Sequence, residues 1–161
     1  QNATERLKLR ADNFLNSRRY DSAIRNYELI VYGRKDESLP VDFYGNVWHN
    51  MGIAYVRMFF FREAEVCFKT AYEINKNISS LKSSVVAKVL GANGNMEFDD
   101  EMSYVTAKEV ETIMDHIDEE VSYVPLLNAI KLREEGRMTE YNDAVNEVID
   151  NWKNEYRNYM K

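Results

Sequence analysis

The chain has 161 residues, of which 45% are hydrophobic and 30% charged, and it carries a net charge of −6. This composition fits a globular domain with a core, and sparse glycine and proline argue against disorder. The negative charge disfavours nucleic-acid binding, which depends on neutralising phosphates. The longest wholly apolar run, residues 58–61, is far below the roughly 20 residues of a membrane span. We therefore expect a cytoplasmic protein with neither nucleic-acid nor membrane partners.

The first half of the chain predicts four helices from an apolar period of three to four residues. They cover residues 5–16, a second segment through residues 23–31, residues 42–58 and residues 62–75. Asp21 is expected to cap the second helix. The loop 33–40 separates the second helix from the third, since Gly33 ends one helix and Pro40 cannot continue it.

The second half predicts four more helices. They cover residues 79–91, residues 105–121, a segment with Pro125 in its first turn and Gly136 at its end, and residues 139–159. The β-branched residues occur singly at helical spacing, so no strand pattern competes. The sequence therefore predicts an all-α protein of about eight helices, arranged as antiparallel pairs.

The helix pairs share a set of landmarks. In residues 46–75 these are Trp48, Met51-Gly52, Tyr55, Ala64, Phe68 and Ala71. This segment closely resembles a tetratricopeptide repeat, apart from the closing proline, which Lys76 replaces. The resemblance implies a right-handed helical solenoid. We expect the two helices of this pair to cross tightly at Gly52 and Ala64, because both residues are small.

The same landmarks predict that residues 1–161 form one domain built of repeats. Residues 4–32 form the first repeat and residues 45–76 the best one. Residues 78–121 form a degenerate or irregular helix pair, in which an acidic insertion precedes the second helix. Residues 122–161 form a degraded repeat with a long capping helix, in which Tyr141 replaces the small residue.

Three consecutive phenylalanines, Phe59, Phe60 and Phe61, fall in the turn of the best repeat. Phe61 is expected in the core, like Tyr20 and Met138 in the other copies. Phe59 stands where the family commonly has glycine, so we expect no left-handed backbone there. Phe60 is left open between packing on the neighbouring turn and exposure as a contact point.

No catalytic motif is found. The chain lacks a nucleophile elbow, a phosphate-binding glycine loop, a zinc-protease helix and a dinucleotide fingerprint. The acidic stretch 93–101 lacks the ligand spacing of an EF-hand. Cys67, the single cysteine, is expected to be a small buried hydrophobe. We therefore expect no enzyme activity, no cofactor and no metal.

The resemblance implies a binding groove lined by the first helices of the pairs. The residues that it places there as partner-binding candidates are Lys8, Asp12, Asn46, His49, Asn50, Ile53 and Arg57. Lys8 and Asn50 match positions that grip a C-terminal carboxylate in the family's chaperone-binding members. Asp12 stands where asparagine is expected and would repel that carboxylate, which argues against a chaperone tail.

Three functions stay open. The first is a non-enzymatic adaptor that binds a peptide or protein segment in the groove. The second is a peptide-sensing regulatory domain of a larger signalling or transcription protein. The third is a self-associating structural domain, with a homodimer formed through Phe60 or through the face of Trp152, Tyr156 and Tyr159. Core or cap packing is the competing interpretation of that aromatic face.

Overall fold

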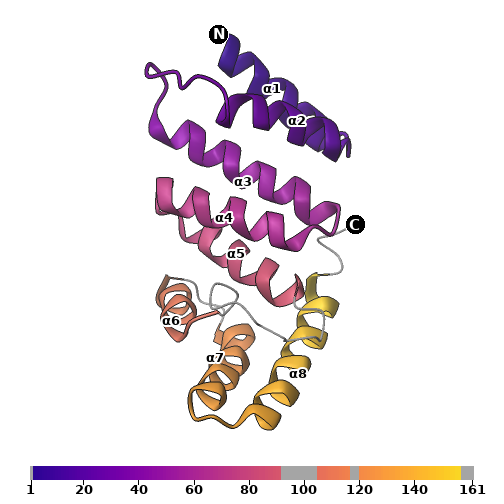
Figure 1. Ribbon diagram of the computed structural model, residues 1–161, viewed down its shortest axis with the longest axis vertical. Coiled ribbons are helices and arrows are strands. Elements are labelled where there is room, and N and C mark those ends of the chain that lie inside the picture. The colour runs from indigo at the N-terminus through magenta and orange to yellow at the C-terminus, as the bar shows by residue number, and fades with distance from the viewer. Residues whose placement is uncertain (1, 92–104, 117–119, 157–161) are drawn as a thin grey trace. The chain divides into compact units, whose positions relative to one another are not determined.

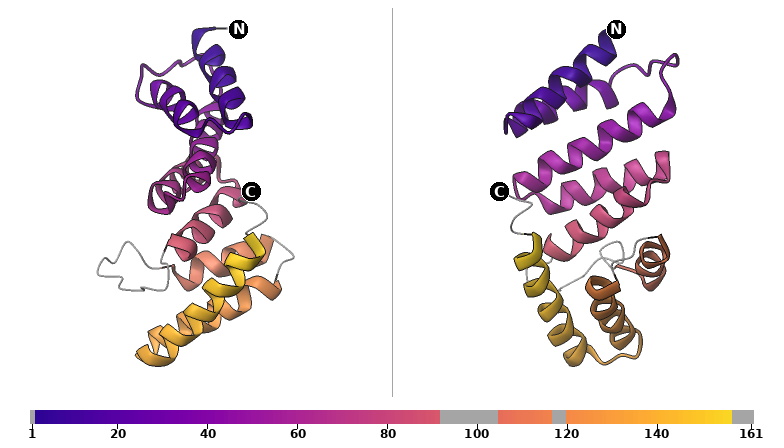
Figure 2. Two further views of the ribbon diagram at one scale, coloured as in Figure 1. Left: turned by 90° about the vertical axis from the view of Figure 1, so that its right-hand side faces the viewer. Right: turned by 180° about the vertical axis from the view of Figure 1, so that it is seen from behind.

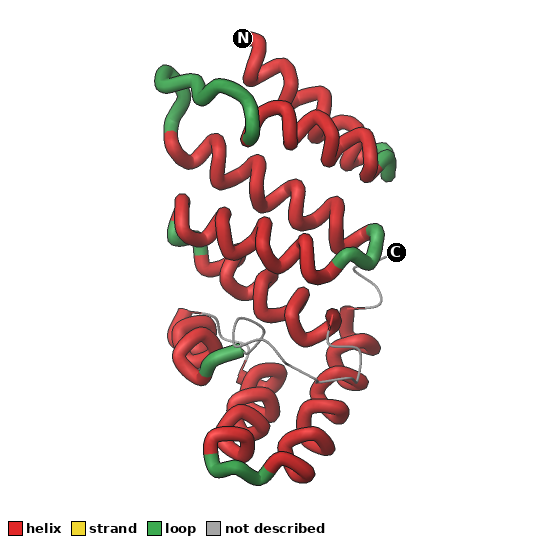
Figure 3. The backbone as a smooth tube through the Cα atoms, viewed as in Figure 1, coloured by secondary structure: helices red, strands yellow, loops and turns green. Residues whose placement is uncertain are grey.

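The computed structural model describes residues 2–91, 105–116 and 120–156 (Figure 1). Within these ranges the protein is all-α, with eight helices and no strand. Figure 3 shows the helices and the loops that join them. The helices are α1 (Ala3–Asn16), α2 (Tyr20–Val31), α3 (Val41–Arg57), α4 (Phe61–Asn75), α5 (Ile78–Gly91), α6 (Ala107–His116), α7 (Glu120–Glu134) and α8 (Met138–Tyr156).

The helices pack mostly against their neighbours in sequence. α1 packs on α2, α3 on α4, and α7 on α8, while α2 also contacts α3 and α6 contacts α7. The chain forms two compact units, residues 1–87 and residues 88–161, and their boundary falls inside α5. None of the helices in the described ranges is long and apolar enough to cross a membrane.

The core of the first unit begins with the predicted α1–α2 contact. Ala11 and Ala23 are fully buried and let the two helices approach closely, with Tyr27 buried beside them. Leu7 and Phe14 pack around this cluster from α1, as their helical spacing predicts. The first helix pair is therefore held by the residues that the sequence pattern selected.

The start of α1 is capped, but the predicted cap of α2 is wrong. Asn2 Oδ1 accepts from the Glu5 amide at 2.8 Å, and Glu5 Oε1 accepts from the Asn2 amide, which forms a capping box. Asp21 lies inside the first turn of α2, where its carboxylate accepts from the Ser22 amide. The helix starts two residues earlier than this cap implies, with Arg19 in the cap position.

The predicted tight contact between α3 and α4 is confirmed. A Cβ added at Gly52 would lie 2.6 Å from Cε1 of the Phe68 ring, so the ring occupies the space that a side chain would need. Ala64 is fully buried nearby. Gly52 therefore allows an aromatic ring of α4 to lie directly on the backbone of α3.

In three helix pairs, the two helices are joined by a turn of the same type. Arg18, Phe59 and Gly136 all have left-handed backbones, with φ of 62°, 63° and 76°. In each turn the next amide returns to a carbonyl five residues earlier: Arg19 to Phe14, Phe60 to Tyr55, and Arg137 to Leu132, at 2.8, 2.9 and 3.0 Å. These are the bonds of a helix end with a left-handed residue. The expectation that Phe59 avoids this conformation is therefore wrong.

The aromatic residues of the α3–α4 turn are more exposed than the repeat frame implied. Phe61 is only partly buried, and its ring lies 6.1 Å from that of Phe59. Met138, its counterpart in the last pair, is 48% exposed. The expectation that Phe61 is a core residue is therefore wrong, since the first residue of the second helix stays partly exposed in both pairs.

The loop between α2 and α3 is ordered around Asp36. Asn2 Nδ2 donates to Asp36 Oδ2 at 2.6 Å, and the Asp36 amide donates to the Tyr44 hydroxyl at 2.7 Å. Asp36 Oδ1 also accepts from the amide and hydroxyl of Ser38. The loop is thus tied to the start of α1 and to α3, although it lengthens the spacing between the first two pairs.

The second unit departs from its predicted boundaries. The helix predicted over residues 105–121 ends as α6 at His116, and Val121 belongs to α7. Pro125 lies inside α7 rather than in its first turn, because that helix begins at Glu120. The acidic stretch 93–101 lies outside the described residues.

The core of the second unit is aromatic. Trp152 of α8 is 2% exposed and meets Tyr123 of α7 edge to face, with ring centroids 5.3 Å apart. Tyr141 is buried, with the Arg133 guanidinium over its ring at 5.7 Å. Trp152 is therefore a core residue, as the packing interpretation predicts, while the Tyr156 side chain and Tyr159 lie outside the described part of the chain.

Candidate protein-binding face

The seven predicted binding residues lie on two adjacent helices of the first unit. Lys8 and Asp12 belong to α1, and the other five, Asn46, His49, Asn50, Ile53 and Arg57, belong to α3. α1 contacts α3 directly, and the helices of this unit follow one another in chain order (Figure 2). We call these seven residues the α1–α3 face.

Asp12 is the centre of a hydrogen-bonded cluster on this face. Its carboxylate accepts from Lys8 Nζ at 2.7 Å, from the Tyr27 hydroxyl, and from Asn50 Nδ2 at 3.2 Å. Three helices therefore meet at one carboxylate. The Asp12 charge is compensated by Lys8 and two further donors, so the repulsion expected from the sequence is reduced.

Tyr27 also belongs to this cluster, and the sequence pattern did not indicate the hydrogen bond of its hydroxyl. Its spacing marks it as a core position, and its ring is indeed fully buried. Burial, followed by the hydrogen bond and negative charge of Asp12, raises the pKa of the Tyr27 hydroxyl far above its usual range. The useful signal is the aspartate at position 12 of α1, because a partly buried carboxylate needs donors nearby.

His49 connects α3 to α5. Its Nδ1 lies 2.8 Å from the Ser80 hydroxyl, and its ring lies 5.0 Å from that of Phe68. Burial lowers the pKa of His49, which favours the neutral imidazole at pH 7. His49 is thus fixed within the first unit, and Ser80 is a contact that the sequence pattern did not indicate.

The other three residues of the face differ in their burial and in their contacts. Asn46 is exposed, and its Oδ1 lies 3.5 Å from Asn75 Nδ2 of α4. Ile53 packs against the buried cluster of Ala64 and Phe68. Arg57 is half-buried and makes no hydrogen bond or ion pair with the described residues.

Two side chains of the first unit that carry nucleophilic atoms, Ser80 and Cys67, are buried. Ser80, the only hydroxyl beside His49 among the described contacts, is 3% exposed and therefore shielded from a substrate. Burial, and then the charges of Glu28 and Glu63, raise the pKa of the Cys67 thiol to about 12, which disfavours the nucleophilic thiolate. Within the described ranges, no group of three His, Cys, Asp or Glu side chains is placed to hold a metal.

Comparisons with known proteins gave no match: no protein-family model, curated protein or solved structure matches this chain. The resemblance to tetratricopeptide repeats therefore stays a prediction from the sequence landmarks quoted above.

Proposed function

We propose that this chain is a non-enzymatic adaptor that binds an extended protein segment on the α1–α3 face. In this proposal the helix pairs form a right-handed solenoid of tetratricopeptide type, with α1 and α3 on its concave side. The three equivalent left-handed turns support a repeated helix pair, since they lie five residues before Ala23, Ala64 and Tyr141. The contact of α1 with α3 supports the stacking of first helices.

The observation that carries the proposal is the cluster at Asp12. It fixes the positions of Lys8 and Asn50, whose side chains come from successive helix pairs. Lys8 uses one of its three donors on Asp12, and the Asn50 carbonyl makes no contact in this cluster. A pre-positioned ammonium and amide suit the carbonyl and carboxylate groups of a peptide backbone, because little side-chain entropy is lost on binding.

Arg57 extends this set of donors along α3. It lies seven residues after Asn50, which is two helical turns and places both on the same side of the helix. We therefore expect an extended segment with acceptors that match Lys8 and Asn50 at one end and an acidic residue that matches Arg57 at the other. This polarity is a testable property of the ligand.

The experiment is an affinity capture from the source cell with two charge-matched variants. The first variant combines Asn50→Ala with Arg57→Glu on the face. The control combines Asn13→Ala with Arg34→Glu, both exposed and outside it. Circular dichroism checks that both remain folded.

A partner that binds the parent and the control but not the face variant supports the proposal. A partner that binds all three places the interface elsewhere, and a chain that elutes as a dimer and captures nothing favours the self-associating domain. Binding that requires a fused effector domain favours the regulatory alternative.

A further inference from the structure

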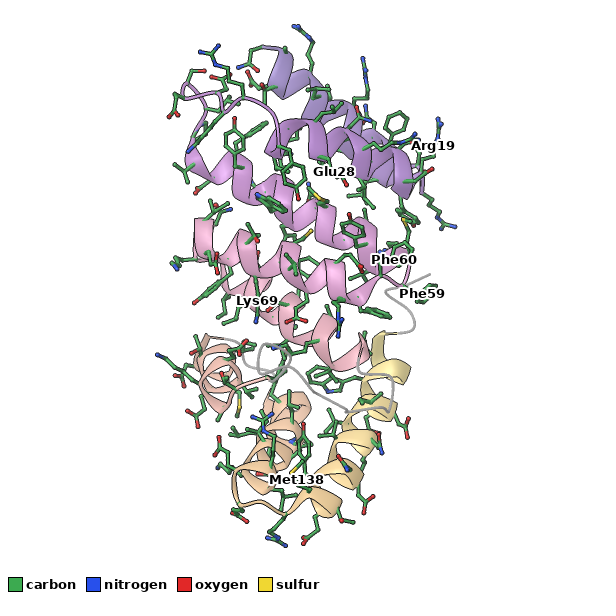
Figure 4. The ribbon with its side chains drawn as sticks, in the orientation of Figure 1. Arg19, Glu28, Phe59, Phe60, Lys69 and Met138 are labelled. Carbon is green, nitrogen blue, oxygen red and sulfur yellow. The ribbon has the colours of Figure 1, made fainter. Side chains whose placement is uncertain are left out.

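Two neighbouring turns of the first unit form a second exposed surface. They are the α1–α2 turn, residues 17–20, and the α3–α4 turn, residues 58–62, which we call the turn edge. Both turns lie at the same end of their helix pairs in Figures 1 and 2. Arg19, Phe59 and Phe60 project from this end in Figure 4.

The turn edge differs in charge from the rest of the chain. It contains three arginines, Arg18, Arg19 and Arg62, and no acidic residue, in a chain of net charge −6. All three side chains are exposed. Arg19 lies over the Phe14 ring at 4.9 Å, so its guanidinium is partly fixed by an aromatic contact.

The aromatic side chains of the edge are equally exposed. Phe59 is 65% exposed and Phe60 is 47% exposed, which places two large apolar side chains beside the arginines. Phe60 rests edge to face on Tyr55, with ring centroids 6.4 Å apart, and Phe59 rests on Phe61. The two rings are therefore oriented before any partner arrives.

The backbone supplies an independent argument. A left-handed residue other than glycine is strained, and a bulky one is an outlier. Gly136 shows that glycine satisfies the same turn in this chain, with nothing within 4 Å of its missing side chain. Arg18 and Phe59 keep their side chains at the two turns of the edge despite this strain. Strain that the fold does not need points to a use for the side chains.

We propose that the turn edge docks an acidic segment of a partner protein that carries an apolar or aromatic side chain. The arginines match the acidic residues, and Phe59 with Phe60 receives the apolar group. A protein fits better than an anionic bilayer, because Asp21 and Glu63 lie in the first turns of α2 and α4, next to the edge. A peptide can place its few acidic residues beside the arginines and away from these carboxylates, whereas the phosphates of a bilayer form a continuous layer. This surface is separate from the α1–α3 face and does not depend on the adaptor proposal.

The test is a selection of random 16-residue displayed peptides on the parent chain, with counter-selection on a variant that carries Arg18→Gly and Phe59→Gly. Glycine relieves the backbone strain, so we expect each single variant to raise Tm by about 3 °C. The same variants should weaken the selected peptides at least tenfold. Stability and binding would then change in opposite directions, which a folding defect cannot produce.

A control variant, Leu29→Ser, removes an apolar side chain of similar exposure, 62%, from outside the edge and should leave peptide affinity within twofold. Selected peptides that share two or more acidic residues beside an apolar one, and that lose affinity when either is replaced, support the proposal. Peptides without this pattern, or peptides that bind the glycine variants equally well, overturn it. Binding to phosphatidylserine vesicles in place of peptides, lost in the glycine variants, would assign the edge to a membrane and also overturn it.

Discussion

Asp12 of α1 accepts a hydrogen bond from the hydroxyl of Tyr27 of α2, and the same carboxylate also binds Lys8 and Asn50. We expect Tyr27→Phe to lower the free energy of unfolding by about 2 kcal/mol, since the partly buried charge loses one donor. Urea denaturation measures this change. Tyr32→Phe is the control, because Tyr32 is 72% exposed and should change stability by less than about 0.5 kcal/mol. Equal effects would show that the Asp12 contact does not stabilise the fold.

The burial of Tyr27, together with its hydrogen bond to Asp12, predicts a loss of stability in alkali. The pKa of Tyr27 is raised in the folded state, so the unfolded chain releases this proton first, near pH 10. The contribution of Tyr27 is fully present below pH 10 and is lost as the pH rises above it. Denaturation midpoints between pH 8 and 11 should therefore fall more steeply for the parent than for Tyr27→Phe.

His49 predicts the opposite pH dependence. Burial lowers its pKa in the folded state, so the unfolded chain binds a proton first as the pH falls below about 6.5. Stability is full above that pH and decreases on acidification. Midpoints measured from pH 7.5 to 5 should decrease less for His49→Gln, which keeps a hydrogen-bonding group near Ser80. Identical slopes would contradict this assignment.

The contact between Gly52 and Phe68 predicts a coupled pair of substitutions. Gly52→Ala places a methyl group 2.6 Å from the ring, so we expect a loss of about 2 kcal/mol. In the background of Phe68→Leu the same change should cost less, because the smaller side chain leaves room. A double-mutant cycle measures the difference. Additive losses would show that the ring does not limit position 52.

The left-handed positions 59 and 136 predict opposite changes in stability when glycine is introduced at one and removed at the other. Phe59→Gly should stabilise the chain by about 1 kcal/mol, and Gly136→Ala should destabilise it by about the same amount. Space around Gly136 is open, so its effect reports the backbone alone. Thermal denaturation of both variants gives the signs, and a destabilising Phe59→Gly would mean that the Phe59 ring contacts outweigh the strain.

Cys67 gives a direct measure of local opening. The thiol is 4% exposed, and its pKa is raised to about 12, chiefly by burial. We expect a thiol-reactive dye at pH 8 to react at least 100-fold more slowly with the folded chain than with the urea-unfolded chain. Since Cys67 is the single cysteine, Cys67→Ser should abolish the signal. Fast labelling of the folded chain would show that α4 opens readily.

The helices and their tight contact could be predicted because they depend on local pattern. The spacing of Ala11, Ala23 and Ala64 reports which faces meet, and Gly52 reports where a ring fits against a backbone. These are properties of neighbouring residues at helical period. The start of a separate helix at Glu120 could not be predicted, because Val121 continues the apolar spacing of the helix before it.

The polar contacts of the site could not be predicted in the same way. Asp12 meets Tyr27 and Asn50 across separations of 15 and 38 residues, and His49 meets Ser80 across 31. Such pairs depend on how whole helices are rotated and offset. Phe59 was misjudged for a related reason: glycine is the usual residue at a left-handed position, but the turn imposes that conformation on whatever residue stands there.

Asn2 uses both ends of its side-chain amide, the oxygen on the Glu5 amide at the start of α1 and the nitrogen on Asp36 in a loop 34 residues later. The first turn of the first helix and the longest connection in the first unit are thereby held by one side chain. Removing residues 1 and 2 would release both the helix start and the loop, although the sequences of the helix and the loop would be unchanged. The order of the loop after the first helix pair therefore depends on a residue that precedes that pair in the sequence.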